Sequence, residues 1–160
     1  MNKGVKYIES KINTMKRYII VATGLLALLF TACSQESITH QADNLPAKAR
    51  DIISANFTSA VSLVEEEKDF GKTTEYEVTL TDGSELKFNS SGEWISIDTP
   101  NNRSVPSGLI PTAIAKYVVS KHAGASIVGI EKEKKGYEIE LSNGVEISFD
   151  KGGNFLKYDK

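Results

Sequence analysis

The sequence predicts an α+β fold made of two tandem copies of one unit, a helix packed on a four-stranded antiparallel sheet. The stretch LTDGSELKFNSSGEW at residues 80–94 recurs sixty-one residues later as LSNGVEISFDKGGNF at residues 141–155. Apolar and polar residues alternate in front of both stretches, which is typical of strands with one buried face. An amphipathic segment opens each copy and predicts the helix.

The first 32 residues predict an export signal. Lys16-Arg17 precede the apolar run YIIVATGLLALLFTA, which is too short for a comfortable transmembrane span. The run ends at Cys33, the only cysteine. A basic pair, an apolar run and small residues before one cysteine resemble a bacterial lipoprotein signal, in which the cysteine is lipidated and becomes the first residue of the mature chain. The alternative is an ordinary signal peptide cleaved near Ala32.

The charge of the chain changes when this segment is removed. Translation from Met15 would give a compact signal, whereas Met1 places fourteen further residues in front of it, so we expect the start at Met15. Residues 1–32 hold five bases and one acid, which leaves 14 Lys or Arg and 20 Asp or Glu. Nucleic acid is excluded as a partner because it demands a basic face. Membrane contact is expected through lipidated Cys33 only.

Residues 33–44 are polar without periodicity and predict a flexible tether. The first unit then spans residues 45–98. Its helix begins at Leu45-Pro46, since proline is tolerated in a first turn. The strands of this unit are expected from Ala60, over residues 75–80, over residues 86–88 and over residues 93–97. Asp82-Gly83 predicts a tight hairpin between the second and third strands.

Residues 99–109 are rich in Pro, Asn, Ser and Gly and predict a linker. The second unit spans residues 110–160 and repeats the pattern, with a helix from Ile110-Pro111 and a hairpin at Asn143-Gly144. A unit of this size buries too little apolar surface to be stable alone. We therefore expect the two units to support each other, for example with their sheets side by side.

The repeated residues resemble a known family. Tyr-Glu-Val-x-Leu-x-Asp-Gly at residues 76–83, Leu-Lys-Phe at 86–88 and Gly-Glu-Trp at 92–94 are similar to PepSY-like domains. These domains are also described as beta-lactamase-inhibitor-like and occur in tandem in secreted or lipid-anchored proteins of gut Bacteroidetes. The resemblance covers residues 45–160 and implies the repeated helix-and-sheet unit. For function it implies binding, with inhibition of a secreted enzyme as one form.

The chain departs from a beta-lactamase inhibitor in one respect. Such an inhibitor grips its target with an aromatic-rich concave sheet face, whereas the strand positions expected to point outward here are charged or polar. They are Glu75, Glu77, Thr79, Lys87, Glu138, Glu140, Ser142, Glu146 and Ser148. This composition argues against inhibition of a beta-lactamase.

The sequence predicts no catalytic site, no metal site and no cofactor. Nucleophilic catalysis needs a nucleophile, a base and a group that orients the base. The histidines are His40 in the tether and His122 near the end of the second helix, where the first unit has Phe57. One cysteine and two distant histidines cannot form a zinc site, and residues 65–67 lack the spacing of a calcium loop. We therefore do not expect an enzyme.

Trp94 and Phe155 are the candidate partner-binding residues. Strict alternation places them opposite the apolar face of the fourth strands, where an aromatic side chain can anchor a partner. The alternative is that they cover a sheet edge or the junction between the units. The predicted function is a lipid-anchored binding module of the cell envelope that recognises an unknown protein or peptide and can inhibit a secreted enzyme. The alternative is a small-molecule or cation sensor that uses the acidic sheet face.

Overall fold

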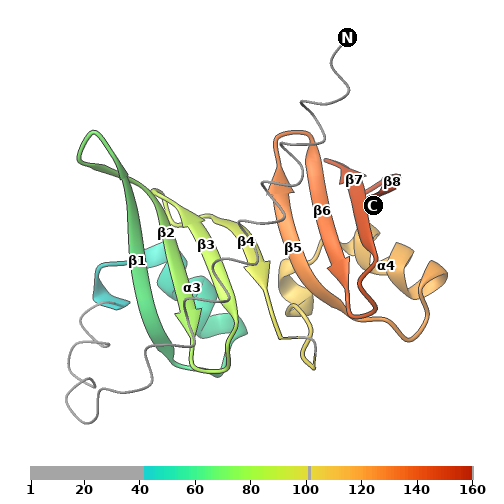
Figure 1. The fold of residues 1–160 in the computed structure, drawn as a ribbon, viewed down its shortest axis with the longest axis horizontal. Coiled ribbons are helices and arrows are strands. Elements are labelled where there is room, and N and C mark those ends of the chain that lie inside the picture. Colours follow the sequence, from blue (N-terminus) through green and yellow to red (C-terminus); the bar gives the residue numbers. More distant parts are fainter. Residues whose placement is uncertain (1–41, 101, 160) are drawn as a thin grey trace. The chain divides into compact units, whose positions relative to one another are not determined.

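A computed structural model of the protein describes residues 42–100 and 102–159. The predicted signal segment, Cys33 and residues 33–41 of the predicted tether lie outside the described residues. The first half contains α3 (Ala47–Asn56), β1 (Val61–Asp69), β2 (Lys72–Leu80), β3 (Glu85–Asn89) and β4 (Trp94–Asp98). The second half contains the short 3-10 turn η2 (Ser107–Leu109), α4 (Thr112–Lys121), β5 (Ile127–Glu133), β6 (Gly136–Leu141), β7 (Glu146–Asp150) and β8 (Phe155–Asp159). Figure 1 shows these elements in chain order.

The eight strands form a single sheet in the order β1 to β8, with every strand antiparallel to its neighbours. The predicted fold class, two tandem copies of a helix packed on a four-stranded antiparallel sheet, is therefore wrong. The described residues form a mostly β structure, one eight-stranded antiparallel sheet with the two α-helices α3 and α4. The halves join through three residue pairs between β4 and β5, which are Ser96 with Glu131, Ile97 with Ile130 and Asp98 with Gly129.

Unpaired strand edges explain why the sheet is continuous. Two separate sheets would leave the backbone N–H and C=O groups along one edge of β4 and one edge of β5 without partners in the sheet. Pairing these edges satisfies the backbone and buries Ile97 and Ile130, which are 0% and 2% exposed. Nothing in the local alternation of either strand encodes this pairing, because it joins segments on opposite sides of a connection that includes a helix.

The segment predicted to be a linker takes part in the junction. The N–H of Thr99 donates to the carbonyl of Val128, and the N–H of Val105 donates to the carbonyl of Ile127, each over 2.8 Å. Val105 is 2% exposed and belongs to the core. Thr99 and Val105 of this segment therefore stabilise the junction between the halves.

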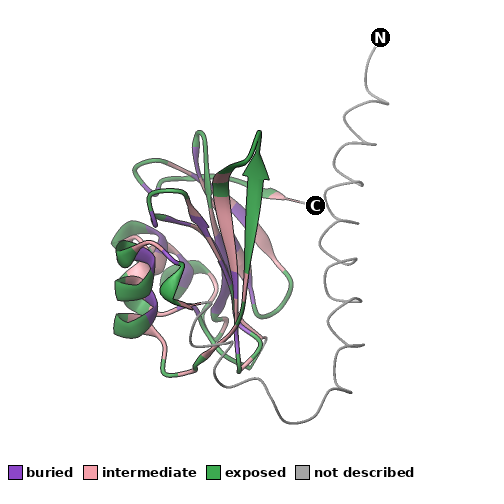
Figure 2. Cartoon of the chain, turned by 90° about the vertical axis from the view of Figure 1, so that its left-hand side faces the viewer, coloured by how far each residue is buried: buried purple, intermediate pink, exposed green. Residues whose placement is uncertain are grey.

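Both helices lie on the same side of the sheet (Figure 2). Each follows a proline and buries two residues one turn apart, Ala49 and Ile53 in α3 and Ile114 and Val118 in α4. The helices and strands share one core cluster, whose strand residues include Val78, Leu80, Leu86, Phe88, Ile97, Ile127, Ile130, Ile139, Leu141, Ile147 and Phe149. Within residues 42–100 and 102–159, no helix is both long and apolar enough to cross a bilayer.

The hairpins after β2 and β6 occur where the sequence predicts them, but their turns are looser. At these two turns only the glycines, Gly83 and Gly144, have positive φ, at 85° and 78°. A two-residue turn with positive φ at both positions instead joins β1 to β2, with Phe70 at 48° and Gly71 at 77°. Asp82 contributes through its side chain, since Oδ1 accepts a hydrogen bond from the N–H of Ser84.

Candidate binding surfaces

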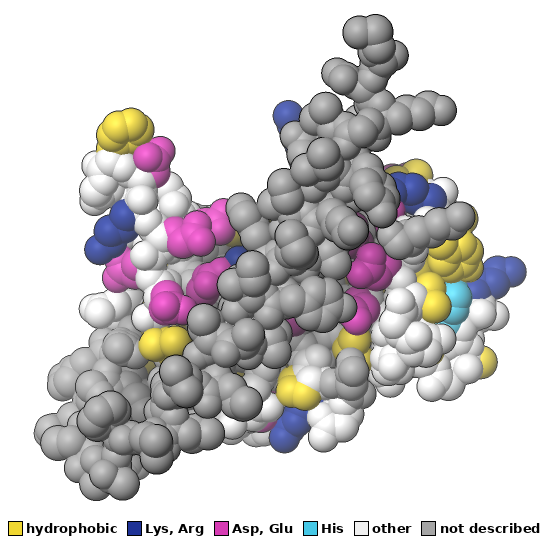
Figure 3. All heavy atoms as spheres, in the orientation of Figure 1, with side chains coloured by type: hydrophobic (Ala, Val, Ile, Leu, Met, Phe, Trp, Pro, Cys, Tyr) yellow, Lys and Arg dark blue, Asp and Glu magenta, His cyan; other side chains and the backbone are white. Residues whose placement is uncertain are grey.

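The side of the sheet away from the helices is strongly acidic. The register places on it a set of side chains that we call the acidic sheet face: Glu65, Glu67, Glu75, Glu77, Glu85, Lys87, Asp98, Glu131, Glu138, Glu140, Glu146, Lys157 and Asp159. Figure 3 shows Asp and Glu side chains gathered over the strands on the side turned toward the viewer. The outward positions predicted from alternation in β2 and β6 are confirmed by this register.

Acids stand directly opposite acids across neighbouring strands of this face. Where two charged residues of this face lie opposite each other on neighbouring strands, both are acids unless one is a lysine. The acidic pairs are Glu65 with Glu77, Glu67 with Glu75, Glu85 with Asp98, Glu131 with Glu138, Glu140 with Glu146, and Glu146 with Asp159. Like charges directly opposite one another destabilise a sheet. The opposed pairs therefore concentrate negative charge on this face.

The two lysines of the face lie among carboxylates. Lys87 pairs with Glu77. Burial lowers the pKa of Lys87, but the hydrogen bond with Glu77 and the nearby charges of Glu77, Glu67 and Glu75 outweigh it, so the pKa is raised. The pKa of Lys157 is raised in the same direction, first by its hydrogen bond with Asp159. The negative potential of the face thus holds both lysines in their charged form.

The surroundings of Glu85 on this face raise the pKa of its carboxyl group. Burial raises the pKa of Glu85, and the negative charges of Asp98 and Glu77 raise it further, against a smaller opposing effect of Lys87. Because the pKa in the folded protein lies above that in the unfolded chain, ionisation of this carboxyl opposes folding at neutral pH.

Replacement of Glu85 by glutamine should therefore raise the melting temperature at pH 7. The advantage should shrink as the pH falls through the raised pKa, and it should vanish below the ordinary value of 4.5, where both states of the wild type are protonated. Thermal unfolding from pH 3 to pH 8 measures this. Asp51→Asn, on the exposed side of α3, removes the same charge away from the face and is the control. An unchanged or lower melting temperature for Glu85→Gln at pH 7 contradicts the prediction.

Trp94 lies on the helix side of the sheet, so the expected placement on the opposite face is wrong. Lys87 pairs with Ser96, but the next residue, Phe88, pairs with Trp94, and Ile95 is the extra residue of a β-bulge. The bulge shifts the alternation by one residue and turns the indole toward the core. Trp94 is 9% exposed and belongs to the core cluster.

Lys132 of β5 covers Trp94. Its ammonium nitrogen lies 3.6 Å from the centroid of the indole ring and donates a hydrogen bond of 3.0 Å to the carbonyl of Trp94. A cation over an aromatic face is attracted by the quadrupole of the ring. Burial lowers the pKa of Lys132, and the charge of Glu93 opposes this shift. Trp94 is therefore held at the junction of the halves, as the alternative interpretation of this residue expected.

Phe155 occupies the equivalent position of β8, and its surroundings are more open. The same bulge places it opposite Phe149 on the helix side, where it is 38% exposed. Its ring stacks on Tyr117 of α4 with 5.2 Å between centroids, and Tyr158 lies 5.0 Å away. His122, which the sequence assigned to the core or the helix end, caps α4 and places Nε2 3.2 Å from the hydroxyl of Tyr158.

Tyr117 completes this group, which we call the β8 aromatic cluster: Tyr117, His122, Phe149, Phe155 and Tyr158. Its hydroxyl lies 3.2 Å from that of Tyr158. Burial, together with this hydrogen bond and the charge of Tyr158, raises the pKa of Tyr117 to about 12. The hydroxyl of Tyr117 therefore stays protonated at neutral pH and takes part in a hydrogen bond within the cluster.

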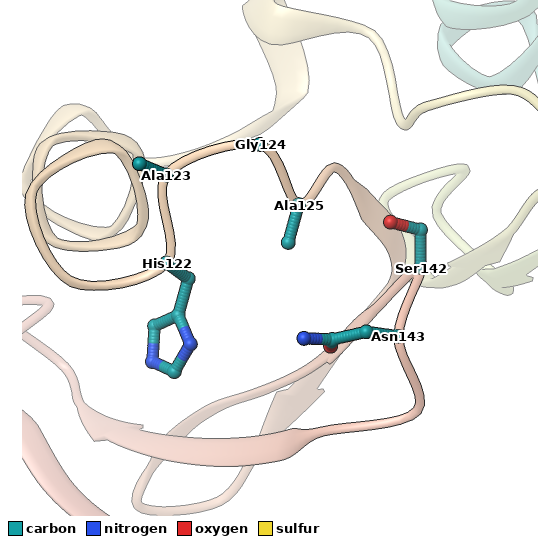
Figure 4. Close-up of a pocket in the computed structure, with 6 residues that line it drawn as sticks. All are labelled: His122, Ala123, Gly124, Ala125, Ser142 and Asn143. Carbon is teal, nitrogen blue, oxygen red and sulfur yellow. The ribbon is translucent and has the colours of Figure 1, made fainter.

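An open pocket of about 270 Å³ lies beside the end of α4 (Figure 4). Its lining consists of His122, Ala123, Gly124, Ala125, Ser142 and Asn143. The hydroxyl of Ser142 accepts a hydrogen bond from the N–H of Ser126, and His122 faces Tyr158. These hydrogen bonds of the two side chains therefore run to Ser126 and Tyr158, which lie outside the lining of the pocket.

The acidic residues that the structure describes do not form a compact metal site. Among residues 42–100 and 102–159, no group of three or more His, Cys, Asp or Glu side chains is arranged to hold a metal ion. The carboxylates of the acidic sheet face are instead spread along the strands, which suits contacts with an extended charged surface.

One family model and several solved structures match the chain. A family model described as "Putative beta-lactamase-inhibitor-like, PepSY-like" matches residues 74–157. No curated protein matches the chain.

Three solved structures are similar over most of their lengths. One, a "putative periplasmic protein of unknown function" from Bacteroides vulgatus, shares 47% identity with a TM-score of 0.70, covering 74% of this chain and 94% of that one. A "putative calcium-regulated periplasmic protein" from Bacteroides thetaiotaomicron shares 37% identity with a TM-score of 0.68, covering 74% and 93%. Another periplasmic protein from Bacteroides vulgatus, also described as putative, shares 33% identity with a TM-score of 0.68 and the same coverage.

Proposed function

The chain belongs to the PepSY-like, beta-lactamase-inhibitor-like family, and we propose that it is a non-catalytic binding module that takes a basic segment of a partner protein on the acidic sheet face. The observation that carries this proposal is the row of acids opposed to acids across the strands. A face that carries this much negative charge is complementary to a positively charged partner. Inhibition follows where that basic segment belongs to a secreted enzyme.

A charge-reversal variant tests the proposal. Glu67→Lys with Glu75→Lys changes one directly opposed acidic pair into an equally opposed basic pair, so the repulsion between the two strands is kept. Asp43→Lys with Asp51→Lys makes the same change of net charge at exposed positions outside the sheet. Both variants are expressed in cells, and partners are crosslinked and identified by mass spectrometry.

We expect the Glu67/Glu75 variant to capture its basic partners at least about ten-fold less than the wild type, and the Asp43/Asp51 variant to capture them equally well. Capture by the wild type should also fall as salt is raised, because exposed charges are screened beyond about 8 Å at 0.15 M ionic strength. The same set of partners at the same yield for both variants would contradict the proposal.

A divalent-cation sensor is the second candidate, favoured by the description of the Bacteroides thetaiotaomicron protein as calcium-regulated. Calorimetry with CaCl₂ on the full chain tests it. Saturable binding that the Glu67/Glu75 variant loses would support a cation site on the acidic sheet face. Heats that never exceed those of dilution would eliminate this candidate.

Location in the cell envelope agrees with the periplasmic descriptions of the three solved relatives. We propose in addition that Cys33 is lipidated and that lipid at this residue is the contact with the membrane. Cells fed an alkyne fatty acid should label the wild type, and Cys33→Ser should abolish the label and release the protein from the membrane fraction. Labelling that persists in Cys33→Ser would contradict lipidation at this residue. The unit boundaries, 45–98 and 110–160, and the start at Met15 stay predictions.

A further inference from the structure

β8 has the sequence pattern of an interior strand but lies at the end of the sheet. Its residues, FLKYD, align one by one with WISID of β4, and both strands carry the same bulge. β4 is covered along its second edge by β5, whereas β8 is the last strand of the sheet among the described residues. Trp94 and Ile97 are therefore 9% and 0% exposed, while the equivalent Phe155 and Tyr158 are 38% and 50% exposed. Three of the six exposed large hydrophobic residues in the described part of the chain lie on this one strand.

We propose that β8 pairs through this edge with an extended segment of a partner protein, in the antiparallel register that β5 uses on β4. The inference rests on the proposed binding function. It deepens that function by naming a second contact site, the edge of β8, and the residue types that a partner segment would place there. Addition of a strand to a sheet edge gains affinity from backbone hydrogen bonds and specificity from alternate side chains. The β4–β5 junction shows which side chains this edge accepts.

The junction specifies a four-residue pattern. Gly129 lies opposite Asp98, where an added Cβ would come within 2.8 Å of the carboxylate Oδ1, so a small residue belongs there. Ile130 lies opposite Ile97, and the next residue is the acid Glu131.

The last position of the pattern is basic, because Lys132 covers the ring of Trp94 and binds its carbonyl. Transferred to β8, the pattern is small, aliphatic, acidic and basic, facing Asp159, Tyr158, Lys157 and Phe155. The acidic residue of the segment would also be attracted by a positive charge on β8, because Lys157 occupies the position that the uncharged Ser96 has in β4.

Strand β1 of a second copy of this chain fits the edge of β8 poorly. β1 is the free strand at the other end of the sheet, and the alignment of β1 with β5 places Leu63 at the small position and Glu66 at the basic position. Leucine brings a bulky side chain against Asp159, and glutamate cannot make the cation contact with the Phe155 ring. The pattern therefore favours a segment from another protein over β1 of a second copy.

Two peptides from the chain itself provide a matched test. The peptide of residues 126–133, SIVGIEKE, carries the pattern, and the peptide of residues 60–67, AVSLVEEE, carries the β1 version. Each is labelled with a fluorophore and titrated with the full chain while anisotropy is measured. We expect the first peptide to bind at least ten-fold more tightly than the second, and the Lys132→Glu form of the first peptide to lose that advantage. Equal binding of all three, or no binding of the first at millimolar chain, would overturn the proposal.

Variants of the chain locate the binding. Phe155→Ser and Tyr158→Ser should each weaken binding of SIVGIEKE at least five-fold, while Val119→Ser, at an exposed apolar site on α4, should leave it unchanged. Circular dichroism verifies that each variant is folded, and slowed amide exchange confined to residues 155–159 on peptide addition reports the edge directly. Protection elsewhere in the sheet, or equal losses for all three variants, would overturn the assignment to β8.

The proposal for the acidic sheet face and the proposal for the edge of β8 can be contradicted independently of each other. The Glu67→Lys/Glu75→Lys variant should bind SIVGIEKE like the wild type, because that pair lies on β1 and β2. Loss of cellular partners by that variant with no peptide binding would leave the proposed function standing and remove this inference. Sedimentation of the full chain should show no concentration-dependent dimer; a dimer that Tyr158→Ser dissolves would overturn the inference by showing a second copy on the edge.

Discussion

Replacement of Phe88 by alanine should remove about 3–5 kcal/mol of unfolding free energy, and it should do so for both halves of the sheet at once. Phe88 is 0% exposed, lies on β3 and pairs with Tyr76 on one side and Trp94 on the other. A cavity at this site removes contacts in the first half directly. The second half should follow because the core cluster and the sheet are continuous through β4 and β5.

The measurement is denaturant unfolding followed by amide hydrogen exchange, with exchange midpoints read separately for β2–β3 and for β6–β7. Phe149→Ala, at the equivalent position of β7, is the matched variant and should give the same pair of coincident midpoints. If Phe88→Ala lowers the midpoint of β2–β3 and leaves that of β6–β7 unchanged, the halves unfold independently and the prediction is wrong.

Replacement of Gly136 by alanine should cost about 3 kcal/mol or more, a value at the upper end for overpacking. An added Cβ would lie 1.9 Å from the carbonyl oxygen of Phe149 and 2.7 Å from the carbonyl carbon of Asp150. Both are backbone atoms of β7, so the start of β6 must move away from its neighbour and lose pairing there. No rotation of a flexible side chain can relieve the contact.

Gly152→Ala is the control for this substitution. The atoms nearest to its added Cβ are the ends of two side chains, Nδ2 of Asn154 at 3.1 Å and Oδ1 of Asp150 at 3.3 Å. It should change the unfolding free energy by less than about 1 kcal/mol. Urea unfolding of the two variants beside the wild type decides the matter, and equal stability of Gly136→Ala and Gly152→Ala would show that β6 tolerates the methyl group.

The individual elements could be predicted because their signals are local. Aliphatic-proline pairs opened both helices, alternation identified β2 and β6 with their outward acids, and Asp82-Gly83 and Asn143-Gly144 marked the hairpins. The family followed from the same residues, and the match to residues 74–157 confirms it.

The pairing of β4 with β5 could not be predicted from these signals, because it depends on which edges meet after the chain has folded. The bulges in β4 and β8 were hidden for a related reason. Unbroken alternation was assumed for WISID and FLKYD. The extra residue of the bulge reverses the predicted side of every position before it. That single shift explains why Trp94 was expected on the outer face and lies in the core, and why Phe155 lies beside Tyr117.

The position of Trp94 also makes its fluorescence a probe of the junction between the two halves. It is the only tryptophan of the chain, and the ammonium group of Lys132, from the opposite half, lies over its ring. Separation of β4 from β5 would remove that cation and admit water to the indole, which shifts its emission to longer wavelength. The intrinsic fluorescence of the unlabelled protein therefore reports, in real time, whether β4 and β5 are paired at the junction between the two halves.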